Sequence, residues 1–186
     1  MRTNTMQTSL VIDSETSTLL LIDVQERLMP AIDQSEEVLR QCIRTAKIAQ
    51  LLQIPIIATE QSPQSIGSNL PSIKVYCDKT VVKEHFNACK DGLIEALPAK
   101  RHQLIVMGCE THVCLMQTVL TLLEKTYDVS IVVDAVGSRR ASDKQIALDR
   151  LKSAGARLIT AEMLAFEWLK SAQHPAFKEI LNLIKE

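Results

Sequence analysis

The sequence predicts a doubly wound, Rossmann-like α/β domain: a three-layer sandwich in which a six-stranded, mostly parallel sheet lies between two layers of helices. Two observations lead to this prediction. Short, continuous apolar segments, typical of strands buried on both faces, alternate with longer segments whose apolar residues recur at helical spacing. The alternation continues through nearly the whole chain after residue 17, and right-handed crossovers then place helices on both faces of the sheet.

Six segments are predicted strands because each is short, apolar and rich in Leu, Ile or Val. In chain order they are residues 18–24, 55–59, 80–83, 103–107, 129–133 and 157–160. Helices are predicted between and after them, from residue 35 to the residues before Pro55 and over 91–97, 111–126, 142–154, 161–170 and 175–185. The first helix begins with acids, which the helix dipole favours there. Ser142 and Gln145 form a capping pair at the start of another.

One connection is much longer than the others. Residues 60–77 form a turn-rich stretch that contains Pro63, Gly67 and Pro71. Loops of this length in a compact domain are usually binding loops or lids. We therefore expect this stretch to lie beside a functional site.

Length and composition restrict the classes of function. The 186 residues suffice for about one domain, and we expect a polar N-terminal arm over 1–16 followed by a single domain over 17–186. A net charge of −1 and 3% aromatic residues argue against nucleic acid and against a polybasic grip on a membrane. No window approaches the ~18 to 20 apolar residues of a membrane span, and the N-terminus lacks the apolar stretch of a signal peptide. The expectation is a cytoplasmic protein.

The number and spacing of the cysteines agree with the expectation of a cytoplasmic protein. The five cysteines are an odd number and contain no C-x-x-C pair, so neither a disulfide framework nor a structural zinc site is predicted. They are expected to be free thiols in a reducing environment.

Three chemically active side chains fall at the carboxyl ends of predicted strands, where ligands bind in doubly wound sheets. The first strand ends near Asp23, the third ends at Lys83, and the fourth leads through a glycine into a helix that begins near Cys114. Each residue alone is weak evidence, because cysteines are usually core residues and lysines are usually solvated. Together they predict an acid, an amine and a thiol in one crevice.

The chemistry of such a thiol needs partners. A helix N-terminus stabilises a thiolate by at most ~1 to 2 kcal/mol, which lowers the pKa of the thiol by about one unit. Most of the thiol is then still protonated at neutral pH. Lys83 would stabilise a thiolate, and Asp23 could take the thiol proton and later return it to a leaving group. His85, two residues after Lys83, and His112, two residues before Cys114, are the competing candidates for the base. If they are not bases, they are polar residues at the rim of the pocket.

The motifs that carry these residues are LLLIDVQERL (19–28), VVKEHFNAC (81–89) and VMGCETHVCLMQT (106–118). Together they resemble the isochorismatase-like cysteine hydrolases, whose motifs are D-x-Q after the first strand, a strand-end Lys, and G-x-x-T-x-x-C at a helix start. The segments TEQSPQSIG (59–67) and HPAFKEILNLIKE (174–186) are most similar to the isochorismatase domain-containing proteins. The resemblance covers nearly the whole chain after residue 17.

The resemblance implies roles for individual residues. Cys114 would be the nucleophile, Asp23 the general base and acid, and Lys83 the group that positions Asp23 and favours the thiolate. It also implies a cis peptide between Cys109 and Glu110, and an oxyanion hole made by the backbone amides of Glu110 and Cys114.

The sequence differs from one branch of this superfamily in the stretch that binds a metal there. Nicotinamidases of this superfamily hold a metal with an Asp and two His after the second strand, but the corresponding stretch here contains no His. We therefore predict no catalytic metal and no cofactor. Gln25, Phe86 and Thr111 are candidate substrate contacts, although Gln25 could equally satisfy a loop and Thr111 could equally cap the helix.

The residues and the resemblance together predict a metal-independent hydrolase of a small amide-like substrate. The resemblance implies that it forms an acyl-enzyme on Cys114 and that the chain is a homo-oligomer. The alternative is a catalytically weak or inactive scaffold that acts through protein association. No G-x-G-x-x-G or P-loop follows a predicted strand, which argues against a mononucleotide-binding protein.

Overall fold

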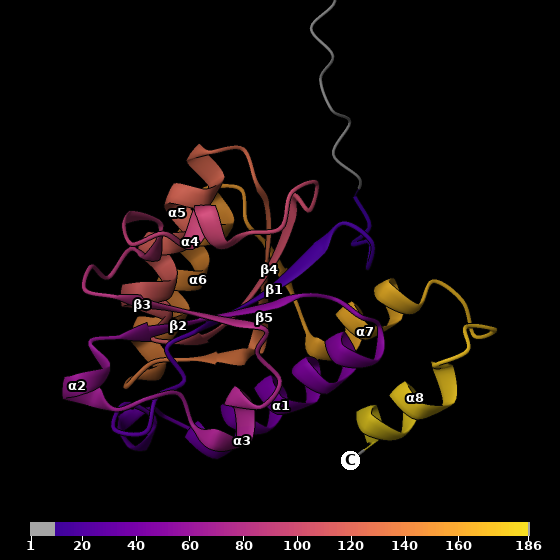
Figure 1. The fold of residues 1–186 in the computed structure, drawn as a ribbon, viewed down its shortest axis with the longest axis horizontal. Coiled ribbons are helices and arrows are strands. Elements are labelled where there is room, and N and C mark those ends of the chain that lie inside the picture. Colours follow the sequence, from indigo (N-terminus) through magenta and orange to yellow (C-terminus); the bar gives the residue numbers. More distant parts are fainter. Residues whose placement is uncertain (1–9, 186) are drawn as a thin grey trace, which may run out of the picture.

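Six parallel strands form one sheet between two layers of helices in the computed structural model, which describes residues 10–185 (Figure 1). The strands are β1 (Ser17–Ile22), β2 (Ile56–Gln61), β3 (Lys79–Lys83), β4 (Gln103–Cys109), β5 (Asp128–Gly137) and β6 (Arg157–Ile159). Their spatial order is β3-β2-β1-β4-β5-β6, and every neighbouring pair is parallel. The predicted fold class is confirmed. Strand order reverses between β1 and β4, which is where a ligand site is expected.

The longer helices cover the two faces of the sheet. One face carries α1 (Ser35–Leu51), α7 (Ala161–Leu169), α8 (Phe177–Lys185) and the short α3 (Pro71–Lys74). The other carries α4 (Leu93–Ala96), α5 (Met116–Glu124) and α6 (Ala141–Ser153). Shorter turns are η1 (Met29–Ala31), α2 (Pro63–Ile66), η2 (Ala88–Lys90) and the π-helical η3 (Thr111–Leu115), which leads directly into α5.

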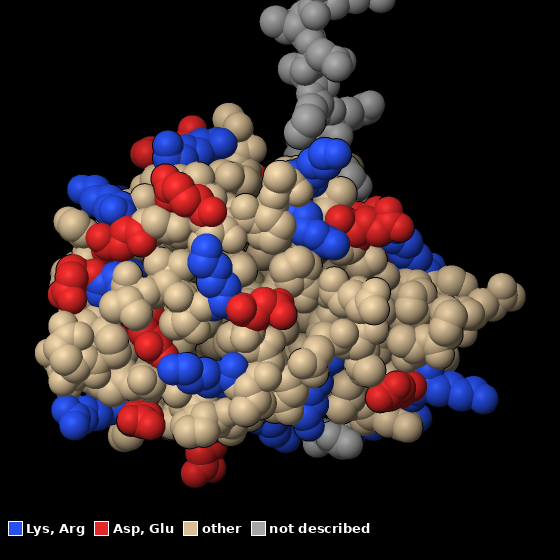
Figure 2. Space-filling model, viewed as in Figure 1, with Lys and Arg blue, Asp and Glu red and all other residues tan. Residues whose placement is uncertain are grey.

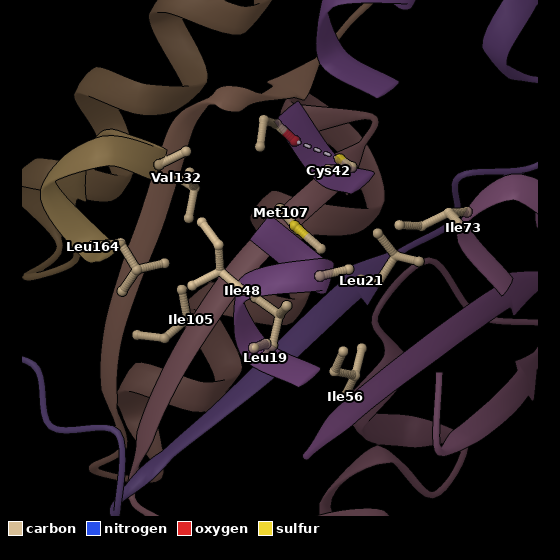
Figure 3. Close-up of a cluster of buried hydrophobic side chains, with 14 of the residues drawn as sticks. Leu19, Leu21, Cys42, Ile48, Ile56, Ile73, Ile105, Met107, Val132 and Leu164 are labelled. Carbon is tan, nitrogen blue, oxygen red and sulfur yellow. Dashed lines mark hydrogen bonds between the residues drawn. The ribbon is translucent and has the colours of Figure 1, made fainter. Parts of the chain in front are cut away.

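Successive side chains along a strand pack into the two cores on opposite faces of the sheet. Along β1, Leu19 and Leu21 join the core under α1 and α7, whereas Leu20 and Ile22 join the core under α5 and α6. All four are fully buried, and burying such a side chain contributes about 1.5–3 kcal/mol. Figure 3 shows the first of these cores, in which the thiol of Cys42 donates a hydrogen bond to the backbone carbonyl of Ala135.

Two local predictions differ from the structure. Ser142 and Gln145 do not cap α6, because the helix begins one residue earlier, at Ala141, and its N-cap residue Arg140 makes no side-chain cap bond. The stretch 60–77 was expected to be a turn-rich loop, but it also contains the last residues of β2 and two helical turns, α2 and α3.

The described residues of the predicted N-terminal arm make hydrogen bonds to the rest of the domain. Ile12 is 1% exposed, and its N–H donates to Glu167 of α7 at 2.7 Å. The N–H of Asp13 donates to Gln103 on β4, also at 2.7 Å. These hydrogen bonds attach residues 10–16 to the domain. The rest of the predicted arm lies outside the described residues.

Charge is evenly mixed over the face of the molecule shown in Figure 2, where lysines and arginines alternate with acids (Figure 2). Within residues 10–185 no helix is long and apolar enough to cross a membrane.

The buried thiols predict a loss of stability at alkaline pH. Burial raises the pKa of Cys42 well above its ordinary value of 9.0, so this thiol stays protonated in the folded chain while it ionises in the unfolded chain above pH 9. Its contribution is therefore intact below pH 9 and is lost as the pH rises toward the folded value, by up to about 1.4 kcal/mol per pH unit. We expect Cys42→Ala to weaken the fall in unfolding free energy between pH 8.5 and 10.5, measured by urea denaturation. Thr45→Ala, on the same buried helix face, should leave the slope unchanged; equal slopes for all three proteins would contradict the prediction.

Candidate active site

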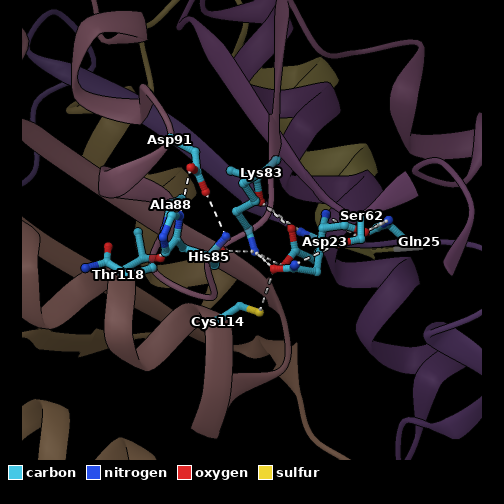
Figure 4. Close-up of polar contacts among 12 residues, drawn as sticks. Asp23, Gln25, Ser62, Lys83, His85, Ala88, Asp91, Cys114 and Thr118 are labelled. Carbon is cyan, nitrogen blue, oxygen red and sulfur yellow. Dashed lines mark hydrogen bonds and ion pairs between the residues drawn. The ribbon is translucent and has the colours of Figure 1, made fainter. Parts of the chain in front are cut away.

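The sheet brings together the three side chains that the sequence singled out. Asp23 directly follows β1, Lys83 is the last residue of β3, and Cys114 lies in η3, just after β4. All three residues are buried, with exposed fractions of 0%, 1% and 7%. In Figure 4 their side chains converge on one point at the carboxyl edge of the sheet (Figure 4).

A buried ion pair is at the centre of this cluster. Nζ of Lys83 lies 2.8 Å from Oδ2 of Asp23, and neither side chain is exposed to solvent. The hydroxyl of Thr59, on β2 between them, donates to Oδ1 of Asp23 at 2.6 Å. Both carboxylate oxygens thus have a partner, which a buried charge requires because it has lost its water.

Backbone geometry positions the carboxylate. Asp23 has a φ of +47°, in the left-handed region that few residues other than Gly, Asn and Asp adopt. Beside it, Gly108 has a φ of +112°, and a Cβ there would lie 2.1 Å from the carbonyl oxygen of Ile22. Only glycine lets β4 approach the end of β1 this closely.

Gln61 is a member of the cluster that sequence reasoning missed. Its Oε1 accepts a hydrogen bond from Nζ of Lys83 at 2.7 Å and lies 4.0 Å from Sγ of Cys114. Gln61 is paired with Lys83 across β2 and β3, so both side chains lie at the same edge of the sheet. The predicted second strand ended at residue 59, two residues too early to place Gln61 at a strand end. Its polar side chain directly after an apolar strand was the available signal.

The thiol of Cys114 is protonated in this arrangement. Burial is the main cause, the carboxylate of Asp23 adds to it, and together they raise the pKa of Cys114 to about 12 although Lys83 opposes them. Lys83 acts in the predicted direction, toward the thiolate, but burial of the thiol and the carboxylate of Asp23 outweigh it.

Neither histidine is bonded to the thiol. Nδ1 of His85 lies 2.9 Å from Oδ1 of Asp91, and Nδ1 of His112 lies 3.0 Å from the hydroxyl of Ser138. The backbone carbonyl of His85, rather than its ring, accepts a long 3.4 Å bond from Lys83. The carboxylate that acts on the thiol of Cys114 is that of Asp23.

The three candidate substrate contacts lie in different surroundings. The amide of Gln25 donates to the carbonyls of Gln61 and Gly67, and its oxygen accepts from the N–H of Gln61, so it satisfies the loop after β2. Thr111 is fully buried and its hydroxyl donates to the carbonyl of Gly137 at 3.0 Å; it does not cap the helix. Phe86 is 53% exposed and lines a depression of about 390 Å³.

The segment that would form the oxyanion hole has an unusual backbone. The peptide between Cys109 and Glu110 is cis, and the carbonyl of Glu110 accepts from the N–H groups of Val113 and Leu115 at 3.1 and 3.2 Å. The side chain of Glu110 accepts from Nε of Arg139 at 2.9 Å. These contacts hold the turn that carries Cys114.

Among residues 10–185, no three His, Cys, Asp or Glu side chains are gathered in a way that could hold a metal ion. The donor set at the site is one carboxylate, one ammonium and one thiol.

The structure is thus a doubly wound α/β domain in which a thiol, a carboxylate and an ammonium group meet at the carboxyl ends of the parallel strands, where such domains bind their ligands. Comparison with known proteins identifies the class more closely. The chain belongs to the isochorismatase domain family, whose model matches residues 17–163.

Named relatives agree with this assignment. The chain is 36% identical over 178 residues to mouse isochorismatase domain-containing protein 2A, covering 92% of this chain and 84% of that protein. It is 34% identical to isochorismatase family protein 1A of Dictyostelium discoideum, covering 92% and 87%. The branch expected from the sequence is confirmed.

Solved structures show the same fold. A Caenorhabditis elegans protein described as MAR1 ribonuclease superimposes with a TM-score of 0.89 at 34% identity, covering 95% of this chain and 93% of that one. The YcaC protein of Escherichia coli, described as an octameric hydrolase of unknown specificity, gives a TM-score of 0.85 at 23% identity and covers 96% and 97%. The second likeness concerns the fold alone.

Removing the ammonium group should destabilise the fold strongly. Lys83→Met leaves the carboxylate of Asp23 buried and unpaired, so we expect the free energy of unfolding to fall by about 3–5 kcal/mol in urea denaturation. Adding Asp23→Asn should recover part of the loss, because no unpaired charge is then left inside. The matched control is Lys170→Met, which removes a half-exposed pair with Asp13 and should cost at most about 1 kcal/mol. Equal losses for the two lysines would contradict a buried pair.

The protonated thiol should react slowly at neutral pH. Cys77 and Cys89, whose pKa values burial raises to about 11, are more exposed than Cys114. With iodoacetamide at pH 7, we expect alkylation of Cys114 to be no faster than that of these two, and to accelerate as the pH rises above 9, measured by peptide mass spectrometry. Selective, rapid labelling of Cys114 at pH 7 would contradict the balance of charges described above.

Proposed function

We propose that this member of a hydrolase family is a metal-independent cysteine hydrolase of small amide-like substrates, acting through Cys114, Asp23 and Lys83. One observation carries the proposal: a thiol at the start of a helix lies against a carboxylate that is itself fixed by a buried ammonium group. A core cysteine has no need of such neighbours, whereas a nucleophile that must lose and regain a proton does.

The reaction would proceed in two halves. As Sγ of Cys114 attacks the substrate carbonyl carbon, its proton passes to the carboxylate of Asp23, and the carbonyl oxygen becomes an oxyanion. The backbone amides of Glu110 and Cys114 would donate to that oxygen. The C–N bond then breaks, the amine leaves with the proton from Asp23, and a thioester remains on Cys114.

Water completes the cycle. Asp23, again a carboxylate, takes a proton from a water molecule that attacks the thioester carbonyl carbon. The carbon–sulfur bond breaks, the carboxylic acid departs, and the proton held by Asp23 returns to Sγ. Throughout, the ammonium group of Lys83 would stabilise whichever of Asp23 and Cys114 carries the negative charge.

Two other functions have specific support. The C. elegans relative at 34% identity is described as a ribonuclease, so RNA is a second candidate substrate despite the balanced net charge of this chain. The other is the scaffold alternative, which gains support from the resting thiol, because a pKa of about 12 leaves Cys114 unreactive until a substrate or partner changes its surroundings. Self-association of the chain stays a prediction.

The decisive variant is Cys114→Ala. We expect it to keep the fold by circular dichroism and to reduce turnover of its best substrate, found in a panel of small amides and ureides, by about a thousandfold or more, because the nucleophile is lost. Cys89→Ala is the matched control and should turn over normally. The wild-type protein should also carry a trapped acyl group on Cys114 by mass spectrometry.

The same three proteins distinguish the rival functions. Cleavage of RNA by the wild-type protein without turnover of any amide would favour the ribonuclease. Undiminished turnover by Cys114→Ala would overturn the assignment of the nucleophile, and a wild-type protein inactive toward both substrate classes would favour the scaffold.

A further inference from the structure

We propose that Gln61 is a positioning residue that keeps Cys114 protonated in the resting enzyme by occupying an N–H group of Lys83 that would otherwise stabilise the thiolate. The inference concerns the site of the proposed function and deepens it. It depends on four contacts of one side-chain amide, none of which the family assignment specifies.

The first step is the hydrogen-bond count at Lys83. An ammonium group has three N–H donors and no acceptor. One of them makes a short 2.7 Å bond to Oε1 of Gln61 and another makes a long 3.4 Å bond to the carbonyl of His85, while the ammonium group forms its 2.8 Å ion pair with Oδ2 of Asp23. The shortest hydrogen bond that Lys83 donates is therefore made to Gln61 and not to the sulfur of Cys114.

The second step is the direction of the Gln61 amide, which its partners fix. Its Nε2 donates to the carbonyl of Glu84 at 2.9 Å and to the hydroxyl of Ser62 at 3.1 Å. Turning the amide by 180° would place its NH₂ against the ammonium group of Lys83 and its oxygen against a carbonyl. Both contacts would be repulsive, so the oxygen must face Lys83 and Cys114.

The third step is the effect on the thiol. An amide oxygen can accept a hydrogen bond from S–H but repels a thiolate, and the 4.0 Å separation from Sγ is at the limit of such a bond. The charged groups that act on Cys114 from the packed elements are Asp23 after β1 and Lys83 on β3. Oε1 of Gln61 contacts both Nζ of Lys83 and Sγ of Cys114, and as an acceptor it favours the protonated form of the thiol.

The remaining charges near Gln61 are engaged with other partners. The carboxylate of Glu84 accepts from Ser62 and Gln64, and His85 is bonded to Asp91. Replacing the Gln61 oxygen by a weak acceptor would therefore free an N–H of Lys83 for the sulfur. Replacing it by a carboxylate would add a negative charge beside the sulfur.

The test uses two variants with opposite expected effects. Gln61→Met has a similar volume and only a weak thioether acceptor in place of the amide oxygen. We expect the pH profile of Cys114 alkylation by iodoacetamide to move about one unit lower, a roughly tenfold faster reaction at pH 8. Gln61→Glu should move the profile higher. Gln64→Met is the matched control, because Gln64 reaches Glu84 but not Lys83, and it should leave the profile unchanged. Peptide mass spectrometry resolves Cys114 from Cys89, whose rate is the internal reference.

Opposite shifts for the two Gln61 variants would support the proposal, since a merely loosened site would accelerate both. An unchanged or raised profile for Gln61→Met, or a lowered profile for Gln61→Glu, would overturn it. Alkylation requires no turnover, so the result is separate from the hydrolase assignment: opposite shifts in a protein that hydrolyses nothing would leave the role of Gln61 intact and refute only the activity.

Discussion

The buried ion pair between Lys83 and Asp23 is the constraint on which the site depends. The two residues come from strands that are not neighbours, because β2 lies between β1 and β3. The pair therefore spans the end of β2, and β2 supplies the dipoles that replace water: the hydroxyl of Thr59 for the carboxylate and the amide oxygen of Gln61 for the ammonium group. A parallel sheet with this strand order places all four groups at one edge.

The same pair explains how a thiol with a pKa of about 12 can serve a reaction at neutral pH. Losing the thiol proton to solvent would add a third charge to a buried cluster that already holds two, which is costly in a medium of low dielectric constant. Moving the proton to Asp23 keeps the number of buried charges at two: the ammonium of Lys83 and the sulfur anion. An adjacent base within the cluster, rather than an ionised resting thiol, is what the surroundings of Cys114 favour.

Much of this arrangement could be predicted from the sequence, and the exceptions have physical reasons. Hydrophobic periodicity predicted the six strands, and their carboxyl ends predicted Asp23, Lys83 and Cys114, because strand ends of a parallel sheet converge. Gln61 was missed because it joins the site through its pairing with Lys83, which depends on strand order and register. The packing of Ile12 likewise depends on Glu167, 155 residues away, which no local pattern encodes.

The loop after β2 bears on the chemistry through Gln61. The side chain of Gln25 accepts a hydrogen bond from the backbone N–H of Gln61 and donates to the backbone carbonyls of Gln61 and Gly67. A side chain at Gly67 would lie 2.9 Å from the carboxylate of Glu26, so the loop fits closely against the segment after Asp23. A displacement of this loop by a substrate would thus reach the amide of Gln61, and through it the donor bonds of Lys83. The long connection that the sequence predicts to be a binding loop is therefore linked by hydrogen bonds to Gln61, the residue that we propose keeps Cys114 protonated.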